Sequence, residues 1–403
     1  MNINRINPST LKITDMRFAD IDGAPKRCTL LKLYTNQGLV GYGEVRDASS
    51  RTYAAMLKSR ILGENPCNVE KIFRRIKQFG GDSRQAGGVC AVELACWDLC
   101  GKAWGLPVWQ LLGGKWRDEI RCYCDTDSEG GGRDMGAALK ERMKMGFTFL
   151  KMDLGIELLA NVKDALIAPL GYLEYMRKMK HVVQTPHGSI DPRSMRGEAF
   201  ELFTTAHGHT GIHITEKGLD YLEKFHLSWA EDVLPWRNVE QWKQLHAATT
   251  TPLGTGEDIY LKEDFKPLLE SHALAVVHPD LLTAGGIAET KKVGDMAEDY
   301  GVQMNIHMAE SPIACLAAVH VAAATRNFMA LELHSVDVPW WGDLVKPALS
   351  YKGGFIKVPT KPGLGIDELN EKLIKKQAGA DFPPPWSPTK EWDREWSNDR
   401  RWS

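Results

Sequence analysis

The feature that most constrains the fold is a regular spacing of polar residues at the ends of apolar segments. From residue 149 onwards, short apolar runs end in a polar residue and are followed by a loop and an amphipathic stretch. The polar end residues recur at intervals of roughly 25 positions; they are Thr205, Glu231, Glu257, Asp280, His307 and Glu332. One unit of strand, loop and helix has about this length. The spacing therefore predicts an α/β fold with a barrel of parallel strands.

The region up to about residue 126 has a mixed pattern. The segment TLLKLYTNQGLVGYGEV is typical of two strands around a turn at Asn36, Gln37 and Gly38. The segment AVELACWDLCGKAWG has apolar residues near helical spacing and stops at Gly105, ahead of Pro107. We expect an α+β region without a nucleotide-binding motif of its own.

Composition and charge narrow the possible partners. The chain has 403 residues, of which 43% are hydrophobic and 25% charged, and its formal net charge is −2. A folded protein without a basic field for nucleic acid or an anionic membrane is expected to bind a small molecule. The first residues lack the apolar core of a signal peptide, and no segment approaches the roughly 20 apolar residues of a membrane span. These features favour a cytoplasmic protein.

The eight cysteines are expected to be buried thiols. No C-x-x-C pair is present, and Cys90, Cys96 and Cys100 fall inside a helical pattern. The alternation RCYCD places Cys122 and Cys124 on one face of a strand, where core packing is the better interpretation.

The carboxyl ends of barrel strands converge on one mouth, where active sites are found. In this chain the mouth would collect Lys151, Asp153, Thr205, His207, Glu231, Glu257, Asp280, His307 and Glu332. Any one of these residues alone could be a solvated strand end. So many ionisable groups together repel one another and lose hydration unless a cation or substrate offsets them. The set is therefore interpreted as a functional site.

Two pairs within this set indicate particular chemistry. Glu231 and Glu257 occupy equivalent positions in successive units, and paired carboxylates suit an oxygen-seeking cation such as Mg²⁺. Asp280 and His307 end adjacent strands. An aspartate that accepts a hydrogen bond from one imidazole nitrogen makes the other nitrogen a poised general base.

By these residues the sequence resembles the enolase superfamily, in its mandelate racemase-like branch, over nearly the whole chain. The motifs that carry the resemblance are GLVGYGEV, GVCAVELACWDLCGKAWGLPVWQLLGGK, WAED, GTGED, HPDLLTAGG and KPGLGIDELNE. The resemblance implies an α+β capping domain at residues 1–126 and a (β/α)7β modified TIM barrel at residues 127–345. Residues 346–403 would return to the cap and end in a tryptophan-rich tail, which we expect to dock on the barrel or on a neighbouring subunit.

The resemblance also assigns roles. Glu231 and Glu257 match the second and third Mg²⁺ carboxylates, and Asp280 with His307 matches the Asp-His dyad that abstracts a proton. Lys151 matches the first lysine of the K-x-K motif. Glu332 matches the acid that faces the carboxylate end of the substrate. Residues His334 and Trp341 are expected to line the pocket.

Two departures from the family pattern affect the predicted reaction. Asp153 stands where racemases have the second lysine of K-x-K, so the base for one face of the substrate is missing. Thr205 stands where the first metal aspartate is expected, while His207 retains the histidine of the D-x-H motif in galactonate- and mannonate-type dehydratases. The candidates for the remaining metal ligand are therefore Asp153 and the Thr205 hydroxyl.

These features together predict Mg²⁺-dependent dehydration of a sugar acid to a 2-keto-3-deoxy acid. His307 would remove the C2 proton, and His207 would protonate the departing C3 hydroxyl. Two alternatives remain: a racemase, epimerase or cycloisomerase of the same superfamily, and a metal-poor, non-catalytic homologue that binds sugar acids. The tryptophan-rich tail favours a homo-oligomer.

Overall fold

The cap is built around a three-stranded antiparallel sheet. The computed structural model describes residues 6–24, 26–126, 132–152, 166–167, 213–214, 223–224 and 226–394. The sheet consists of β1 (Ile13–Ile21), β2 (Cys28–Thr35) and β3 (Val40–Val45), in that order. The predicted turn lies between β2 and β3, where Gly38 adopts a φ of 79°.

One long helix, α4 (Gly87–Trp104), packs on this sheet. The packing is close because β3 carries glycines: a Cβ at Gly43 would lie 2.1 Å from the carbonyl oxygen of Ala91. The helix ends at Gly105 with a φ of 72°, at the predicted position. The other cap helices are α1 (Arg51–Met56), α2 (Lys58–Ile61), α3 (Val69–Ile76) and α5 (Val108–Leu111).

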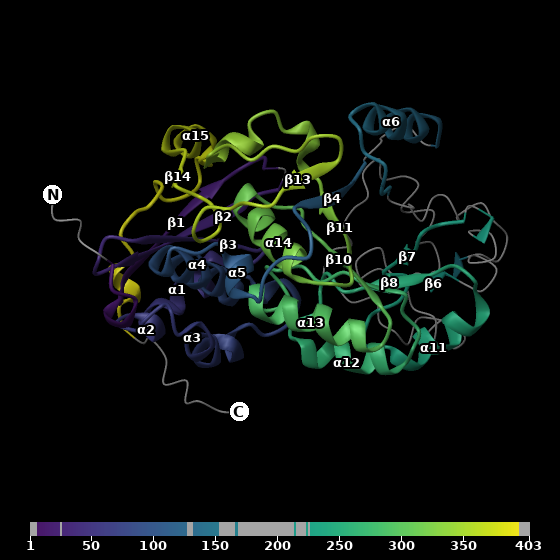
Figure 1. The fold of residues 1–403 in the computed structure, drawn as a ribbon, viewed down its shortest axis with the longest axis horizontal. Coiled ribbons are helices and arrows are strands. Elements are labelled where there is room, and N and C mark those ends of the chain that lie inside the picture. The colour runs from purple at the N-terminus through teal and green to yellow at the C-terminus, as the bar shows by residue number, and fades with distance from the viewer. Residues whose placement is uncertain are drawn as a thin grey trace.

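A seven-stranded sheet lies beside the cap (Figure 1). Its order is β13-β4-β11-β10-β9-β8-β7, with all neighbours parallel except β13 and β4. The strands are β4 (Glu119–Cys124), β7 (Ala230–Glu231), β8 (Leu253–Thr255), β9 (Val276–Val277), β10 (Gln303–Ile306), β11 (Phe328–Leu333) and β13 (Phe355–Lys357). The predicted α/β class, with a cap and a parallel barrel-like domain, is confirmed. Strand β4 belongs to this sheet although it falls inside the range expected for the cap.

Helices follow the strands, as the spacing predicted. They are α6 (Gly132–Lys144), α11 (Val239–Ala248), α12 (Lys262–Glu270), α13 (Ile287–Asp299) and α14 (Pro312–Ala324). Every residue of α14 is buried, because this helix contacts both β3 of the cap and β11 of the barrel. Two short antiparallel pairs complete the strands: β5 (Leu166–Ile167) with β6 (His213–Ile214), and β12 (Val345–Lys346) with β14 (Glu368–Leu369).

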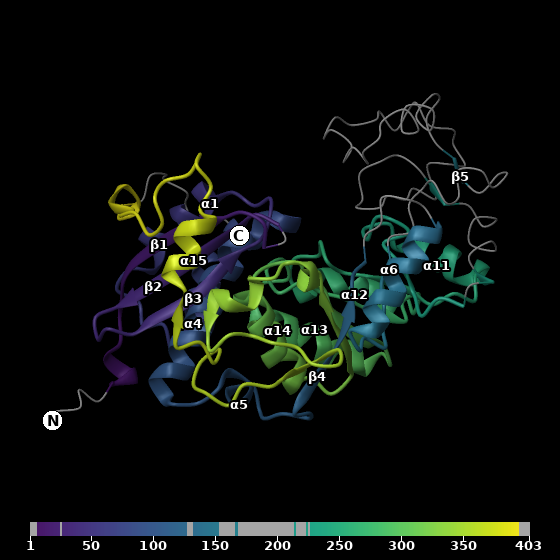
Figure 2. The same cartoon turned by 90° about the horizontal axis from the view of Figure 1, so that it is seen from above.

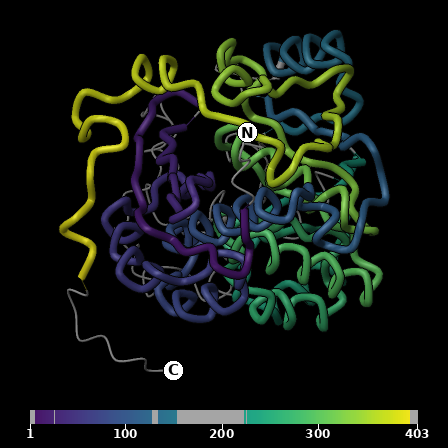
Figure 3. Tube along the Cα trace, turned by 60° about the vertical axis from the view of Figure 1, so that its left-hand side comes forward, coloured from purple at the N-terminus to yellow at the C-terminus, as the bar shows by residue number. Residues whose placement is uncertain are grey.

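The C-terminal segment returns to the cap. Helix α15 (Glu371–Gln377) contacts β1, and Ala378 forms a bridge with Ile21 (Figure 2). Beyond it the chain runs around the N-terminal region (Figure 3), and the amide of Trp386 donates to the carbonyl of Phe18 at 2.8 Å. Within the described residues the tail thus docks on the cap. The expectation that it docks on the barrel was wrong.

All eight cysteines are free thiols, and all but the half-buried Cys67 are buried, as predicted. Among the residues that the structure describes, we find no helix with the length and apolarity that a membrane crossing requires.

Candidate active site at the barrel mouth

The dyad forms where β9 and β10 end. Asp280 and His307 are bridged in parallel register, and His307 Nδ1 lies 2.7 Å from Asp280 Oδ2. The other oxygen of Asp280 accepts from the amide of Leu282 at 2.6 Å, which fixes the carboxylate. With Nδ1 engaged, Nε2 is the nitrogen left to exchange a proton. It lies 3.1 Å from Oε2 of Glu257 and 3.8 Å from Oε2 of Glu332.

Three carboxylates form a cluster beside the dyad. Ligand oxygens of Glu231, Asp232 and Glu257 all lie within 4.8 Å of one another. Burial and the charges of Glu257 and Glu231 hold the pKa of Asp232 well above its usual range. A buried group of like charges is stable when a cation compensates it, and an all-oxygen donor set suits Mg²⁺. The donors present therefore fit a hard divalent cation.

Asp232 was not identified from the sequence. In a regular strand, the residue after Glu231 would point to the opposite face. Here Asp232 has a φ of 49°, which breaks the alternation and turns its carboxylate toward the same cluster. Its Oδ1 accepts a hydrogen bond from the Thr255 hydroxyl at 2.6 Å.

A lysine and a second histidine surround Glu332. Lys151 Nζ lies 2.7 Å from Glu332 and 3.0 Å from Glu231, and Tyr123 donates its hydroxyl to Glu332 at 3.0 Å. The imidazole of His334 lies between Glu332, at 3.1 Å, and Asp125, at 3.0 Å.

Contacts among Lys151, Glu332 and His334 determine the protonation of each side chain. Burial opposes the charge on Glu332, but Lys151, His307 and His334 together hold its pKa well below its usual value. Burial likewise opposes the charge on Lys151, whose pKa Glu231 and Glu332 nevertheless raise well above normal. Burial lowers the pKa of His334, but the charges of Glu332 and Asp125 outweigh it and raise that pKa to about 10. Three basic side chains thus surround the carboxylate of Glu332 at the mouth.

Two arginines from the cap reach the barrel residues. Arg46 is completely buried, and its Nη1 lies 3.3 Å from Asp280 Oδ2, the oxygen that also contacts His307. The same nitrogen pairs with Asp47 at 2.8 Å and with Glu310. Arg84 lies 3.3 Å from Oε1 of Glu257. Sequence spacing gave no signal for these contacts, because they join residues far apart in the chain.

Four predicted site residues remain: Trp341, Asp153, Thr205 and His207. Trp341 is buried in a short 3₁₀ helix, Trp341–Leu344, and its indole donates to the carbonyl of Glu310 at 2.9 Å. This places Trp341 next to a residue that contacts Arg46, and its role as a pocket residue stays a prediction. Asp153, Thr205 and His207 lie outside the described residues.

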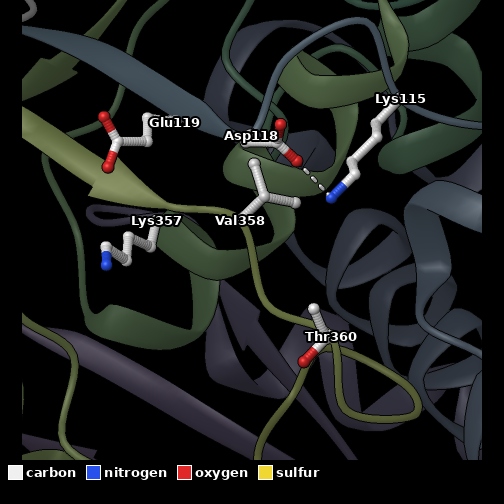
Figure 4. A pocket seen from close by; sticks show the side chains of 6 residues that line it. All are labelled: Lys115, Asp118, Glu119, Lys357, Val358 and Thr360. Atoms are coloured by element: carbon white, nitrogen blue, oxygen red, sulfur yellow. Dashed lines mark ion pairs between the residues drawn. The ribbon is translucent and has the colours of Figure 1, made fainter.

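An open surface cavity of 510 Å³ lies elsewhere, near the start of β4 (Figure 4). It is lined by Lys115, Asp118, Glu119, Lys357, Val358 and Thr360. Lys115 is paired with Asp118 at 2.5 Å. Active sites of β/α barrels lie at the opposite, carboxyl ends of the strands, so this cavity is distinct from the candidate active site.

A separate cap over a barrel mouth that gathers a dyad, a carboxylate cluster and a lysine defines a capped α/β-barrel enzyme. Residues 14–113 match the mandelate racemase / muconate lactonizing enzyme N-terminal domain, and residues 134–372 match the enolase C-terminal domain-like family. The chain belongs to the enolase superfamily, in its mandelate racemase/muconate lactonizing enzyme branch.

Two named relatives and a solved structure agree with this assignment. The chain is 32% identical to a D-xylonate dehydratase of Haloferax volcanii, over 88% of this chain and 86% of the relative. It is 30% identical to a D-galactonate dehydratase of Cronobacter sakazakii, over 90% and 94% respectively. A mandelate racemase/muconate lactonizing enzyme-like protein from Rubrobacter xylanophilus has a similar structure, with a TM-score of 0.74 at 25% identity, covering 93% of this chain and 99% of that one.

Proposed function

We propose that this protein catalyses the Mg²⁺-dependent dehydration of a sugar acid, an aldonate, to a 2-keto-3-deoxy acid. The observation that carries the proposal is the 2.7 Å contact between His307 and Asp280 beside the carboxylates of Glu231 and Glu257. The substrate class is supported by the two relatives, which are named dehydratases of D-xylonate and D-galactonate.

His307 is the base in this reaction. Asp280 holds Nδ1, so Nε2 accepts the proton from C2 of the substrate. The electron pair released at C2 forms the C2–C3 double bond as the C3 hydroxyl leaves. The sequence assigns the proton for that hydroxyl to His207, so the hydroxyl leaves as water. The resulting enol then takes up a proton at C3 and becomes the 2-keto product.

The other site residues bind the substrate and the cation. Lys151 and Glu332 lie at the carboxylate end of the substrate, where the ammonium of Lys151 supplies the attraction and Glu332 holds Lys151 in place. His334 and Trp341 line the pocket. Mg²⁺ held by Glu231, Glu257 and a further ligand would supply positive charge opposite the substrate carboxylate. Asp232 joins Asp153 and Thr205 as a candidate for that further ligand.

A screen of aldonic acids with Mg²⁺, scored for 2-keto product, tests the proposal. For an acid that is turned over, His307→Asn should reduce kcat at least about 10²-fold, because it removes the base. His320→Asn is the matched control. Like His307, His320 is buried, but it lies in α14, where its Nδ1 accepts from the amide of Trp109. Full activity in His307→Asn would contradict the mechanism.

Two further measurements separate the alternatives. Solvent deuterium at C2 of recovered substrate, without 2-keto product, would identify a racemase or epimerase. Calorimetry that detects no Mg²⁺ binding, even with an aldonate present, would identify a non-catalytic binding protein.

A further inference from the structure

A third histidine at the barrel mouth, His278, has no part in the proposed mechanism. It directly follows β9 and is completely buried. Neither of its ring nitrogens has a hydrogen-bond partner among the described residues. An unsatisfied buried polar group costs about 1–3 kcal/mol. A leucine or methionine at this position would avoid that cost, so the imidazole requires an explanation.

The ring of His278 points toward a candidate metal ligand. Its Nδ1 lies 3.7 Å from Oε1 of Glu231, although Glu231 belongs to β7, two strands away. The intervening strand β8 has Gly254 at this level. A Cβ on Gly254 would lie 3.2 Å from Nε2 of His278 and 3.1 Å from Cδ1 of Trp229. The missing side chain therefore makes room for both rings to approach Glu231.

Glu231 already accepts hydrogen bonds on both oxygens. The indole of Trp229 donates to Oε2 at 3.0 Å, and Lys151 donates to Oε1 at 3.0 Å. In the proposed function Lys151 also binds the substrate carboxylate, so its ammonium is shared among Glu231, Glu332 and the substrate. Nδ1 of His278, 3.7 Å from the same oxygen, is placed to supply a further donor.

We propose that His278 is a positioning residue for the metal site, donating its Nδ1–H to Oε1 of Glu231. Together with Trp229 it fixes the carboxylate in the orientation that a divalent cation requires. The role is one of positioning and not of ligation, because the clustered ligand atoms beside it are all carboxylate oxygens. The inference rests on the proposed function, which makes Glu231 a metal ligand. Removing a hydrogen-bond donor behind a metal ligand typically weakens metal affinity 10- to 100-fold.

The test is the dissociation constant of Mn²⁺ for the full chain, measured from the electron paramagnetic resonance signal of free Mn²⁺. His278→Leu, which keeps the volume but removes the donor, should weaken binding about 10- to 100-fold. His278→Gln restores an N–H donor and should recover part of the loss. Gly254→Ala should also weaken binding, because the added Cβ displaces the ring while leaving the imidazole intact.

His320→Leu is the control for the loss of a buried imidazole. It should lower the melting temperature but leave the Mn²⁺ dissociation constant unchanged. The inference is overturned if His278→Leu is folded and binds Mn²⁺ as tightly as the parent protein, or if His278→Leu and His320→Leu weaken binding equally. Glu231→Gln separates a failure of the proposed metal site from a failure of the role of His278. Unchanged Mn²⁺ binding in Glu231→Gln refutes the metal site itself. If Glu231→Gln weakens Mn²⁺ binding but His278→Leu does not, only the role of His278 is refuted.

Discussion

Arg46 neutralises carboxylates of both domains: the partly buried Asp47 of the cap and the buried Asp280 and Glu310 of the barrel. Its guanidinium lies 3.3 Å from Asp280 and 2.8 Å from Asp47, and it also pairs with Glu310. Arg46→Met removes the positive charge beside the buried acids Asp280 and Glu310, whereas Asp47 keeps its pair with Arg84 at 2.7 Å. Breaking a buried ion pair from one side typically costs about 3–5 kcal/mol. We expect a loss of this size in the free energy of unfolding, measured with urea.

An exposed arginine provides the control for this substitution. Arg27 pairs with Asp22 at 2.8 Å, but both side chains are about half exposed. Surface pairs contribute about 0–1 kcal/mol, so Arg27→Met should have a small effect. Equal losses in the two variants would show that Arg46 does not compensate the buried charges.

Asp232 is expected to reduce stability when no cation is bound. It lies within 4.8 Å of the ligand oxygens of Glu231 and Glu257, which repel its charge. Asp232→Asn removes this repulsion but keeps the side-chain oxygen that accepts from Thr255. In the presence of a chelator we expect the variant to be more stable than the parent, by about 1 kcal/mol. Thermal unfolding with and without Mg²⁺ tests this, and a less stable variant in the chelated state would contradict it.

The strand spacing predicted which residues end adjacent strands, and the structure brings Glu231, Glu257, Asp280 and His307 together. It could not predict Asp232, because a positive φ at one residue overrides the alternation of a strand. It could not predict Arg46 either. That contact depends on how the cap docks against the barrel, which local periodicity does not encode.

At the scale of elements, Glu93 joins a cap helix to a barrel helix. This residue of α4 accepts from the amides of Ile287 and Ala288, at 2.8 and 3.0 Å, at the start of α13. Gly286 allows the approach, since a Cβ there would lie 2.1 Å from the carboxylate of Glu93. The carboxylate therefore caps a helix of the other domain.

The burial of Glu93 should make stability depend on pH. Burial raises the pKa of Glu93 from 4.5 to about 7, although three hydrogen bonds oppose the shift. The folded protein therefore holds this proton more tightly than the unfolded chain. Glu93 therefore contributes to stability below pH 4.5, and this contribution is lost as the pH rises through about 7. At about 1.4 kcal/mol per pKa unit, the loss is of the order of 3 kcal/mol.

Glu93→Gln should flatten the pH dependence of the unfolding free energy between pH 5 and 7, measured by chemical denaturation. Trp97→Phe is the control, because it removes only the indole hydrogen bond to Glu93 and keeps the titrating group. An unchanged slope in Glu93→Gln would show that another group dominates this range.

The sequence was most informative about the type and order of elements. Apolar runs with polar ends predicted the parallel strands β7 to β11, and Gly105 marked the end of α4. The domain to which each element belongs was harder to predict. Strand β4 follows the cap helices directly in sequence but pairs with β11 near the other end of the barrel domain. Such a pairing between distant segments is not determined by the local pattern.

At the scale of the whole molecule, the described N-terminal and C-terminal segments, from residue 6 and up to residue 394, both contribute to the cap. The tryptophans of the tail indicated a docked segment but not the surface on which it docks. The structure places Trp386 against Lys32, whose Nζ lies 4.1 Å from the ring centroid, and its indole donates to Glu371 at 2.7 Å. Further along, the hydroxyl of Thr389 donates to the carbonyl of Met16 at 2.6 Å. The C-terminal segment therefore stabilises β1 and its neighbours.

Trp386→Ala tests whether this segment stabilises the cap. The variant loses the ring contact with Lys32 and the hydrogen bond to Glu371, so we expect a loss of about 1–2 kcal/mol in the unfolding free energy. Hydrogen exchange should accelerate at the amides that pair β1 with β2 and remain unchanged in β10 of the barrel. Trp116→Ala is the control, because that side chain is 64% exposed and should contribute little. Equal acceleration in β1 and β10 would mean that the tail supports the whole molecule, and no acceleration in either would mean that it is only attached to the cap.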